Sequence, residues 1–177
     1  MTKSILKNNN GKYKIENVSI EDITQEFSTP TYIYSKKVIL DTNGRVPYNS
    51  KSLDSNCILI TSKMEKKIKE KLRSKGVKIE YIPIGKNKKL DLEYLPEVLI
   101  KYNLINILVE AGSTLPGELL YNNLVNKIIL FISPKIIGES KFTPFGSRGI
   151  NKIMDAYKPK KITNTSIEDD ILIKAWI

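Results

Sequence analysis

The alternation of apolar and polar positions divides the first half of the chain into short strands and one helix. Runs rich in Thr, Tyr, Ile and Val predict strands at 29–41 (TPTYIYSKKVILD), 57–61 (CILIT) and 77–84 (VKIEYIPI). Between the last two runs, Met64, Ile68 and Leu72 recur every four residues. This spacing predicts a helix with one narrow apolar face, which ends at Gly76. The turn-forming residues of 42–50 (TNGRVPYNS) predict a loop after the first strand.

The second half continues the alternation of strands and helices. Strands are expected at 105–110 (INILVE) and 126–138 (NKIILFISPKIIG), helices at 91–103 and 113–123, and a hairpin around "SIEDD" at 159–177. This order predicts an α/β fold with a mostly parallel sheet, helices on its faces and a C-terminal antiparallel hairpin.

The helix expected at 91–103 contains a proline that complicates its start. Asp91 is a plausible N-cap, and one face would carry Leu92, Leu95, Leu99 and Tyr102. Pro96 either falls in the first turn of a helix that begins later, or it bends the element.

Composition narrows the class of protein. A chain of 177 residues with 41% hydrophobic content is long enough for one compact core. We expect a cytoplasmic protein, because no apolar run has the roughly 18 to 20 residues of a membrane span and the start lacks a secretory signal. Cys57, the only cysteine, lies in an apolar run, which predicts a buried, inert thiol. Since there is no histidine, an enzyme of this sequence would depend on a cofactor or on lysines and carboxylates.

The net charge of +10 raises the question of nucleic acid binding. Residues 63–89 hold eleven Lys or Arg against three acids. The basic residues of the whole chain, however, are 26 lysines and only three arginines, and they accompany 27 isoleucines and 15 asparagines, as AT-rich coding DNA would produce. Arginine forks and interleaved aromatic residues are scarce. A solvated lysine surface is therefore favoured over a nucleic-acid site.

The stretch "LVEAGSTLPGELL" at 108–120 is the clearest candidate for a binding site. It leads from a predicted strand into a predicted helix, and ligands of open α/β sheets bind at such turns. Gly112 lets a ligand approach the backbone, Ser113 or Thr114 can cap the helix, and the free amides of the helix start attract anions such as phosphate. The stretch is not a nucleotide-triphosphate loop, because Glu118 and Leu119 stand where Lys and Ser/Thr are required. The residues alone leave open whether this is a phosphate site or a plain capped helix.

A family resemblance adds to this pattern. Residues 105–138, with the run "VEAGSTLPGELL" and a strand ending in "SPKIIG", resemble the C-terminal reductase domain of the bifunctional riboflavin-biosynthesis deaminase/reductase. "VILDTNGRVPYNSKSL" is similar to an upstream strand and loop of that family. The resemblance runs from Val38 to the C-terminus and implies a dihydrofolate-reductase-like fold. Residues 37–177 would form this domain, and residues 1–36 an N-terminal lead that is no independent domain.

The resemblance also implies an activity and a set of site residues. The family reduces the ribose of 5-amino-6-(5-phosphoribosylamino)uracil, a phosphoribosylamino-pyrimidine, to the ribityl form with NADPH. Glu110 would contact the substrate near the transferred hydride, and Thr42 is a further cofactor candidate. The residues that would line the NADPH phosphates are Gly112, Ser113, Thr114, Leu115, Pro116, Gly117 and Glu118. Lys135 is more simply explained as a surface lysine at a strand end, and Asp41 as a turn-former.

The sequence departs from the family at its beginning. The family's N-terminal portion, with the first strand and much of the substrate pocket, has no counterpart here, and neither has the zinc-dependent deaminase domain. Residues 10–35 instead resemble the N-terminal lead of diaminopimelate decarboxylases, without the lysine that holds pyridoxal phosphate. The chain therefore resembles a hybrid whose sheet exposes apolar edges.

Three functions stay open at this point. The first is an NADPH-dependent reductase, completed by a partner chain or by homodimer formation. The second is a catalytically incompetent hybrid or interaction remnant of the same scaffold. Nucleic-acid binding through residues 63–89 ranks last, and neither nucleic acid nor a membrane is expected as a partner.

Overall fold

The computed structural model describes residues 6–9, 12–15, 18–26, 36–136, 143–146, 149–150 and 152–177. The chain divides into two compact units, Met1–Asp91 and Leu92–Ile177. This division differs from the predicted boundary between the N-terminal lead 1–36 and the domain 37–177. That boundary was based on family resemblance, and it stays a prediction. The decarboxylase-like character of residues 10–35 also stays a prediction.

The first unit begins with a small antiparallel sheet that the apolar pattern did not predict. Its strands β1 (Leu6–Asn9), β2 (Lys12–Ile15) and β3 (Val18–Ser19) are paired in that order, and helix α1 (Ile20–Glu26) follows directly. The Ser19 hydroxyl accepts a hydrogen bond from the Asp22 amide at 3.0 Å. A hydroxyl in this position satisfies one of the free amides of the first helical turn.

The parallel sheet of the first unit is built from β4 (Lys37–Leu40), β5 (Cys57–Thr61) and β6 (Lys78–Tyr81). The strand predicted at 57–61 is confirmed. The strand predicted at 29–41 is confirmed over residues 37–40, with 29–35 outside the described part, and the strand predicted at 77–84 is confirmed over residues 78–81. β5 is the middle strand, and all five of its residues are buried. Complete burial explains why its sequence is an uninterrupted apolar run rather than an alternation.

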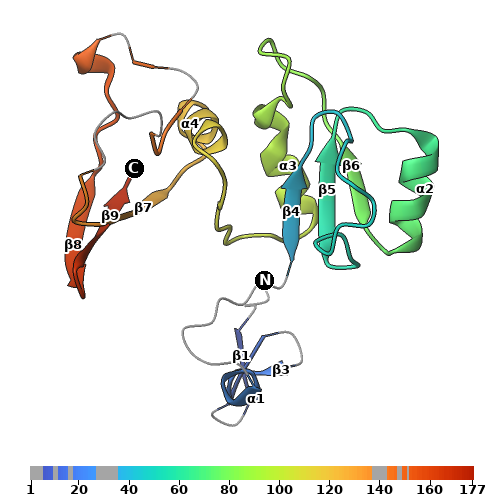
Figure 1. Cartoon of the computed structure of the whole chain (residues 1–177), viewed down its shortest axis with the longest axis horizontal. Helices are drawn as coiled ribbons and strands as arrows, with labels where there is room; N and C mark the ends of the chain where they lie inside the picture. The colour runs from blue at the N-terminus through green and yellow to red at the C-terminus, as the bar shows by residue number, and fades with distance from the viewer. Residues whose placement is uncertain are drawn as a thin grey trace. The chain divides into compact units, whose positions relative to one another are not determined.

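Helix α2 (Lys66–Ser74) covers one face of this sheet, as Figure 1 shows. Leu72 is fully buried in a core formed with Leu53, Cys57, Leu59 and Val77, and Met64 and Ile68 pack against that core. The predicted apolar face is therefore confirmed. Gly76 follows the helix with a φ of +81°, a backbone conformation that favours glycine.

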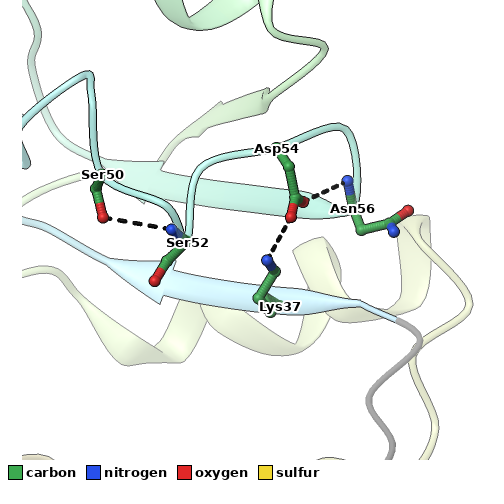
Figure 2. Close-up of polar contacts among 5 residues, drawn as sticks. All are labelled: Lys37, Ser50, Ser52, Asp54 and Asn56. Carbon is green, nitrogen blue, oxygen red and sulfur yellow. Dashed lines mark hydrogen bonds and ion pairs between the residues drawn. The ribbon is translucent and has the colours of Figure 1, made fainter. Parts of the chain in front are cut away.

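The loop that joins β4 to β5 is held by its own polar side chains, as Figure 2 shows. The Asp54 carboxylate accepts the Asn56 amide at 2.9 Å and pairs with the Lys37 ammonium of β4 at 2.5 Å. The Ser50 hydroxyl accepts the Ser52 amide at 3.4 Å. The ammonium of Lys37 and the Asn56 amide hold the pKa of Asp54 below its ordinary value. The contacts of Asp54 lie where β4 and β5 begin, at the amino edge of the sheet.

The second unit opens with two short helices. A 3-10 turn η1 (Leu92–Tyr94) leads into α3 (Leu95–Lys101), with Pro96 in the first turn. Of the two alternatives for Pro96, the helix that begins later is confirmed. Asp91 is not the N-cap of α3, because Tyr94 occupies that position. The buried face consists of Leu92, Leu95 and Val98, with Leu99 and Tyr102 half-buried beside it.

The second unit also holds a three-stranded antiparallel sheet. Its strands are β7 (Lys127–Ile132), β8 (Lys161–Ile167) and β9 (Asp170–Trp176), and β9 lies between the other two. The C-terminal hairpin is confirmed, with Glu168 of its turn at a φ of 53°. A second 3-10 turn, η2 (Ile153–Asp155), precedes β8.

The strand predicted at 105–110 is wrong, because these residues form no strand in the structure. Ile105, Ile107, Leu108 and Val109 are all exposed, with exposed fractions between 41% and 59%. A strand needs the amides and carbonyls of a neighbour, and no strand of the described chain pairs with this segment. Apolar character therefore did not suffice to make a strand here.

Candidate functional site

The predicted binding turn precedes α4 (Thr114–Tyr121), so the helix expected at 113–123 is confirmed. Ser113 stands at the N-cap position with φ −54° and ψ −28°, and its side chain makes no capping hydrogen bond. Thr114 is the first helical residue, so neither hydroxyl is a cap of the expected kind. The amides of Thr114 and Leu115 have no acceptor within the helix, and Pro116 has no N–H. The helix start thus offers two amide donors for an anion.

Gly112, two residues before the first of these amides, has open space around it. A Cβ atom added to Gly112 would meet no atom within 4 Å. Ala111 and Gly112 are both exposed. Open space beside a glycine, next to free helix amides, is the geometry that admits a phosphate close to the backbone.

The two glutamates of the predicted site lie in different environments. Glu110 is exposed, at the end of the apolar segment 105–109. Glu118 is 7% exposed and lies inside α4, where its carbonyl accepts both the amide and the side-chain NH₂ of Asn122, at 3.1 and 2.8 Å. Because residue 118 lies in the second turn of α4, its amide takes part in the helix hydrogen bonds, and its place at the cofactor phosphates stays a prediction.

The glycine at position 117 faces protein rather than open space. A Cβ atom there would lie well under 3.0 Å from the carbonyl oxygen of Gly146. The Gly146 amide in turn donates to the Ser113 carbonyl at 2.8 Å. Segment 143–146, distant in sequence, is therefore packed against the first turn of α4. Sequence inspection did not find Gly146, because a single glycine in an irregular segment carries no local signal.

Thr42 belongs to the other unit, where it follows β4 at the carboxyl edge of the parallel sheet. Its carbonyl accepts the amide and the hydroxyl of Ser62 at 3.2 and 2.6 Å. Asp41 accepts the amides of Asn43 and Val46 at 3.2 and 2.6 Å, which confirms it as a turn-former. The Thr42 side chain is half-buried.

Ser62 and Lys63 are polar residues of this edge that the sequence prediction missed. Thr61 donates its hydroxyl to the Lys63 carbonyl at 2.8 Å, and Gly44 lies against the same carbonyl. The order of the predicted strands could have identified them. The carboxyl ends of adjacent parallel strands meet at one edge of a sheet, so the residues that follow strand 57–61 are expected beside Thr42, which follows the neighbouring strand.

The basic region 63–89 has lysines placed over tyrosine rings. The Lys71 ammonium lies 4.1 Å from the centroid of Tyr48, and the Lys69 ammonium lies 4.8 Å from that of Tyr81. These ring faces are covered by side chains of the chain itself. The arrangement supports the solvated lysine surface.

The only cysteine lies at the centre of the first unit. Cys57 is fully buried, and burial raises the pKa of its thiol to about 11. The predicted burial of the thiol is confirmed, and the raised pKa favours the neutral form, which is a poor nucleophile. Within the described residues, no group of three or more His, Cys, Asp or Glu is placed to hold a metal ion. No helix in that part of the chain combines the length and the apolar character that crossing a membrane requires.

Comparison of the sequence with known families yields one model, described as the RibD C-terminal domain, over residues 23–172. The riboflavin biosynthesis protein RibD of Aquifex aeolicus is 32% identical over 147 residues, which is 81% of this chain and 39% of the relative. A 5-amino-6-(5-phosphoribosylamino)uracil reductase of Buchnera aphidicola is 30% identical over 115 residues, 64% of this chain and 53% of that protein.

Comparison of the fold leads to the same group of proteins. Form 1 of Acinetobacter baumannii RibD superposes with a TM-score of 0.69 at 23% identity, over 92% of this chain and 40% of that one. The riboflavin biosynthesis reductase Rib7 of Saccharomyces cerevisiae superposes with a TM-score of 0.62 at 18% identity, over 80% and 68%. The dihydrofolate-reductase-like mixed α/β fold class predicted from the sequence is confirmed.

Proposed function

The chain belongs to the RibD C-terminal domain family, and we propose that it carries the reductase function after which its relatives are named. The proposed reaction is the NADPH-dependent reduction of the ribose side chain of 5-amino-6-(5-phosphoribosylamino)uracil to the ribitylamino form. The Buchnera aphidicola relative bears the name of a reductase for this compound. Because the chain spans only 39% of the Aquifex aeolicus relative, the proposal covers the reductase step and no other activity of that protein.

The observation that supports the proposal best is the open glycine before α4. Gly112 has open space around it just before the helix start, and the helix dipole adds positive potential at the amides of Thr114 and Leu115. These groups fit one phosphate of a dinucleotide. In the proposal, residues 112–115 contact the cofactor phosphates mainly through their backbone, and residues 116–118 continue the helix behind them.

The remaining roles follow from charge and position. A bound nicotinamide would supply the hydride, so the chain itself needs to bind and orient rather than to provide a nucleophile. Glu110, exposed two residues before Gly112, would contact the substrate. Thr42 lies in the first unit, and its role as a cofactor contact stays a prediction. The preference for NADPH over NADH and the cytoplasmic location are parts of the proposal that await measurement.

Cofactor binding to the purified chain tests this function directly. Trp176 is the only tryptophan and is half-buried in β9, so its fluorescence reports on titrations of the second unit. We expect saturable binding of NADPH, tighter than that of NADH, together with a rise in melting temperature. If the protein is folded and binds neither nucleotide, the reductase function is refuted. The alternative, a catalytically incompetent remnant of the same scaffold, would then be favoured.

A substitution at Gly112 tests where the cofactor binds. In Gly112→Val we expect NADPH affinity to fall at least ~tenfold, the effect of losing one hydrogen bond to a charged group, because the added methyl groups fill the approach to the amides. Folding should be unchanged, since the space beside Gly112 is open. Gly149→Val is the matched control, as Gly149 also has no atom within 4 Å of an added Cβ. Unchanged affinity in Gly112→Val would contradict the site.

A further inference from the structure

Two amides share one carbonyl oxygen at the start of α4. The Ser113 carbonyl accepts the Gly117 amide at 3.2 Å, which is the first bond of the helix. The same oxygen accepts the Gly146 amide at 2.8 Å, from a segment some thirty residues later. The shorter of the two bonds is thus the one that comes from outside the helix.

Both glycines of this contact are required by close packing. An added Cβ on Gly117 would collide with the backbone carbonyl of Gly146, which cannot rotate away as a side chain could. An added Cβ on Gly146 would lie 2.7 Å from the Ser113 Oγ and 3.2 Å from its Cβ. A glycine inside a helix costs roughly 0.5–1 kcal/mol relative to alanine, so Gly117 needs a reason to be there. The approach of Gly146 is that reason, whereas no such contact explains Gly112.

The bond to Ser113 has a consequence for the neighbouring amide. The Ser113 carbonyl and the Thr114 amide belong to one planar peptide group. Fixing the direction of the carbonyl therefore fixes the direction of the Thr114 N–H, which is one of the amides at the helix start that have no acceptor within the helix. A carbonyl that accepts two hydrogen bonds also polarises its peptide group, which makes that N–H a stronger donor.

We propose that Gly146 is a positioning residue of the cofactor turn, which aims the Thr114 amide at a cofactor phosphate through its bond to Ser113. Gly117 in turn serves to admit Gly146 rather than the phosphate. This inference rests on the proposed NADPH site and adds to it a residue 28 positions beyond the turn's last member, Glu118.

Four variants separate positioning from folding. Gly117→Ala pushes the Gly146 backbone away while favouring the helix itself, and Gly146→Ala presses on the Ser113 side chain. The double variant Ser113→Gly with Gly146→Ala removes both atoms that the new methyl group would meet. Gly149→Ala, in open space, is the control.

Three quantities are measured for each variant. They are the melting temperature, the dissociation constant of NADPH at a temperature well below the melting temperature of every variant, and the affinity of inorganic pyrophosphate from its competition with NADPH. We expect Gly117→Ala to weaken NADPH about tenfold to a hundredfold, as for a lost hydrogen bond to a charged group. Gly146→Ala should weaken it less, the double variant should recover, and Gly149→Ala should match the original chain. Pyrophosphate should lose affinity in proportion to NADPH, a change that a purely structural role would not produce.

The outcomes distinguish this inference from the function on which it rests. If the original chain binds NADPH and both single variants bind it within about twofold, a difference too small for one hydrogen bond, Gly146 has no positioning role and the cofactor site stands. A loss for NADPH without a matching loss for pyrophosphate also overturns the role assigned to the Thr114 amide. If the original chain binds no NADPH, the proposed function fails, and this inference fails with it.

Discussion

Two five-residue segments of similar apolar character adopt different structures in this protein. β5 (Cys57–Thr61) lies between β4 and β6, and every one of its residues is buried. Segment 105–109 forms no strand, and its four large apolar side chains are exposed. The pattern of apolar residues is alike in both. The difference lies in the neighbours, because β5 has a hydrogen-bonded strand on each side.

The comparison teaches that an apolar run gains strand structure only with partners. Each unpaired backbone amide or carbonyl that leaves water costs free energy, so a segment without a neighbour keeps its backbone in solvent. In β5 the parallel neighbours satisfy the backbone, and burial of the side chains then stabilises the sheet. Four experiments test this contrast, beginning with the largest expected effect.

The same substitution in the two segments should have very different costs. Leu59→Ala should lower the free energy of unfolding by about 2–5 kcal/mol, because Leu59 is fully buried and its loss leaves a cavity. Leu108→Ala should cost less than about 0.5 kcal/mol, because Leu108 is 51% exposed. Urea unfolding followed by circular dichroism measures both. Equal losses would mean that segment 105–109 is packed like a core strand.

The carboxyl edge of the parallel sheet should be sensitive at Gly44. This residue has a φ of +63°, and an added Cβ would lie 2.5 Å from the Lys63 carbonyl oxygen. Gly44→Ala should lower stability by about 2–4 kcal/mol, as strain and collision add.

Gly85→Ala is the matched control for this edge. Its nearest neighbours would lie at 3.6 and 3.7 Å, ordinary contact distances. We expect thermal unfolding to show a clear loss only for the Gly44 variant. Similar losses in both would argue against a tightly packed edge.

Burial of β5 should also appear in the pH dependence of stability. Burial raises the pKa of the Cys57 thiol from 9.0 to about 11, so above pH 9 the unfolded thiol ionises while the folded one stays neutral. The folded state should thus lose about 2 kcal/mol of stability between pH 9 and pH 11. Cys57→Ala removes this dependence. The slope of unfolding free energy against pH is measured for the original chain and for the variant, and the difference between the two slopes gives the contribution of the thiol without that of the lysines, which also titrate in this range. Identical slopes would show that Cys57 is not buried as described.

The smallest effect is expected at the amino edge of the sheet, where Lys37 pairs with Asp54. Because the pKa of Asp54 is lowered in the folded state, the ion pair stabilises the fold above pH 3.8. This stabilisation is lost as the pH falls through the folded pKa. Asp54→Asn should therefore reduce the drop in melting temperature between pH 6 and pH 3. Both side chains are partly exposed, so added salt should weaken the effect. A drop of the same size in the variant would mean that the pair contributes nothing.

Much of the fold could be predicted from local patterns. The spacing of Met64, Ile68 and Leu72 predicted α2, and turn chemistry around 166–170 predicted the hairpin of β8 and β9. Pro96 left two alternatives for the start of α3, and the structure confirms the helix that begins later. Each of these features depends on residues close together in the sequence. Local periodicity and turn-forming residues were therefore sufficient to predict these elements.

The candidate site was predicted only in part. Gly112 and the start of α4 were recognisable from the sequence and its resemblance to a known family, and the open space beside Gly112 supports that prediction. The same pattern assigned Gly117 an equal role, yet Gly117 lies against Gly146. Two glycines in one motif thus differ in their surroundings, and only a contact with a distant segment distinguishes them.

The sequence by itself determined the helix faces, the turns, the buried thiol and the membership of the RibD C-terminal domain family. The tertiary structure alone decided that residues 105–109 are not a strand, that Thr42 and Ser62 share an edge, and that Gly146 bonds to Ser113. The physical reason is the range of the interactions. Side-chain periodicity acts within a few residues, whereas strand pairing and backbone packing depend on which distant segments meet.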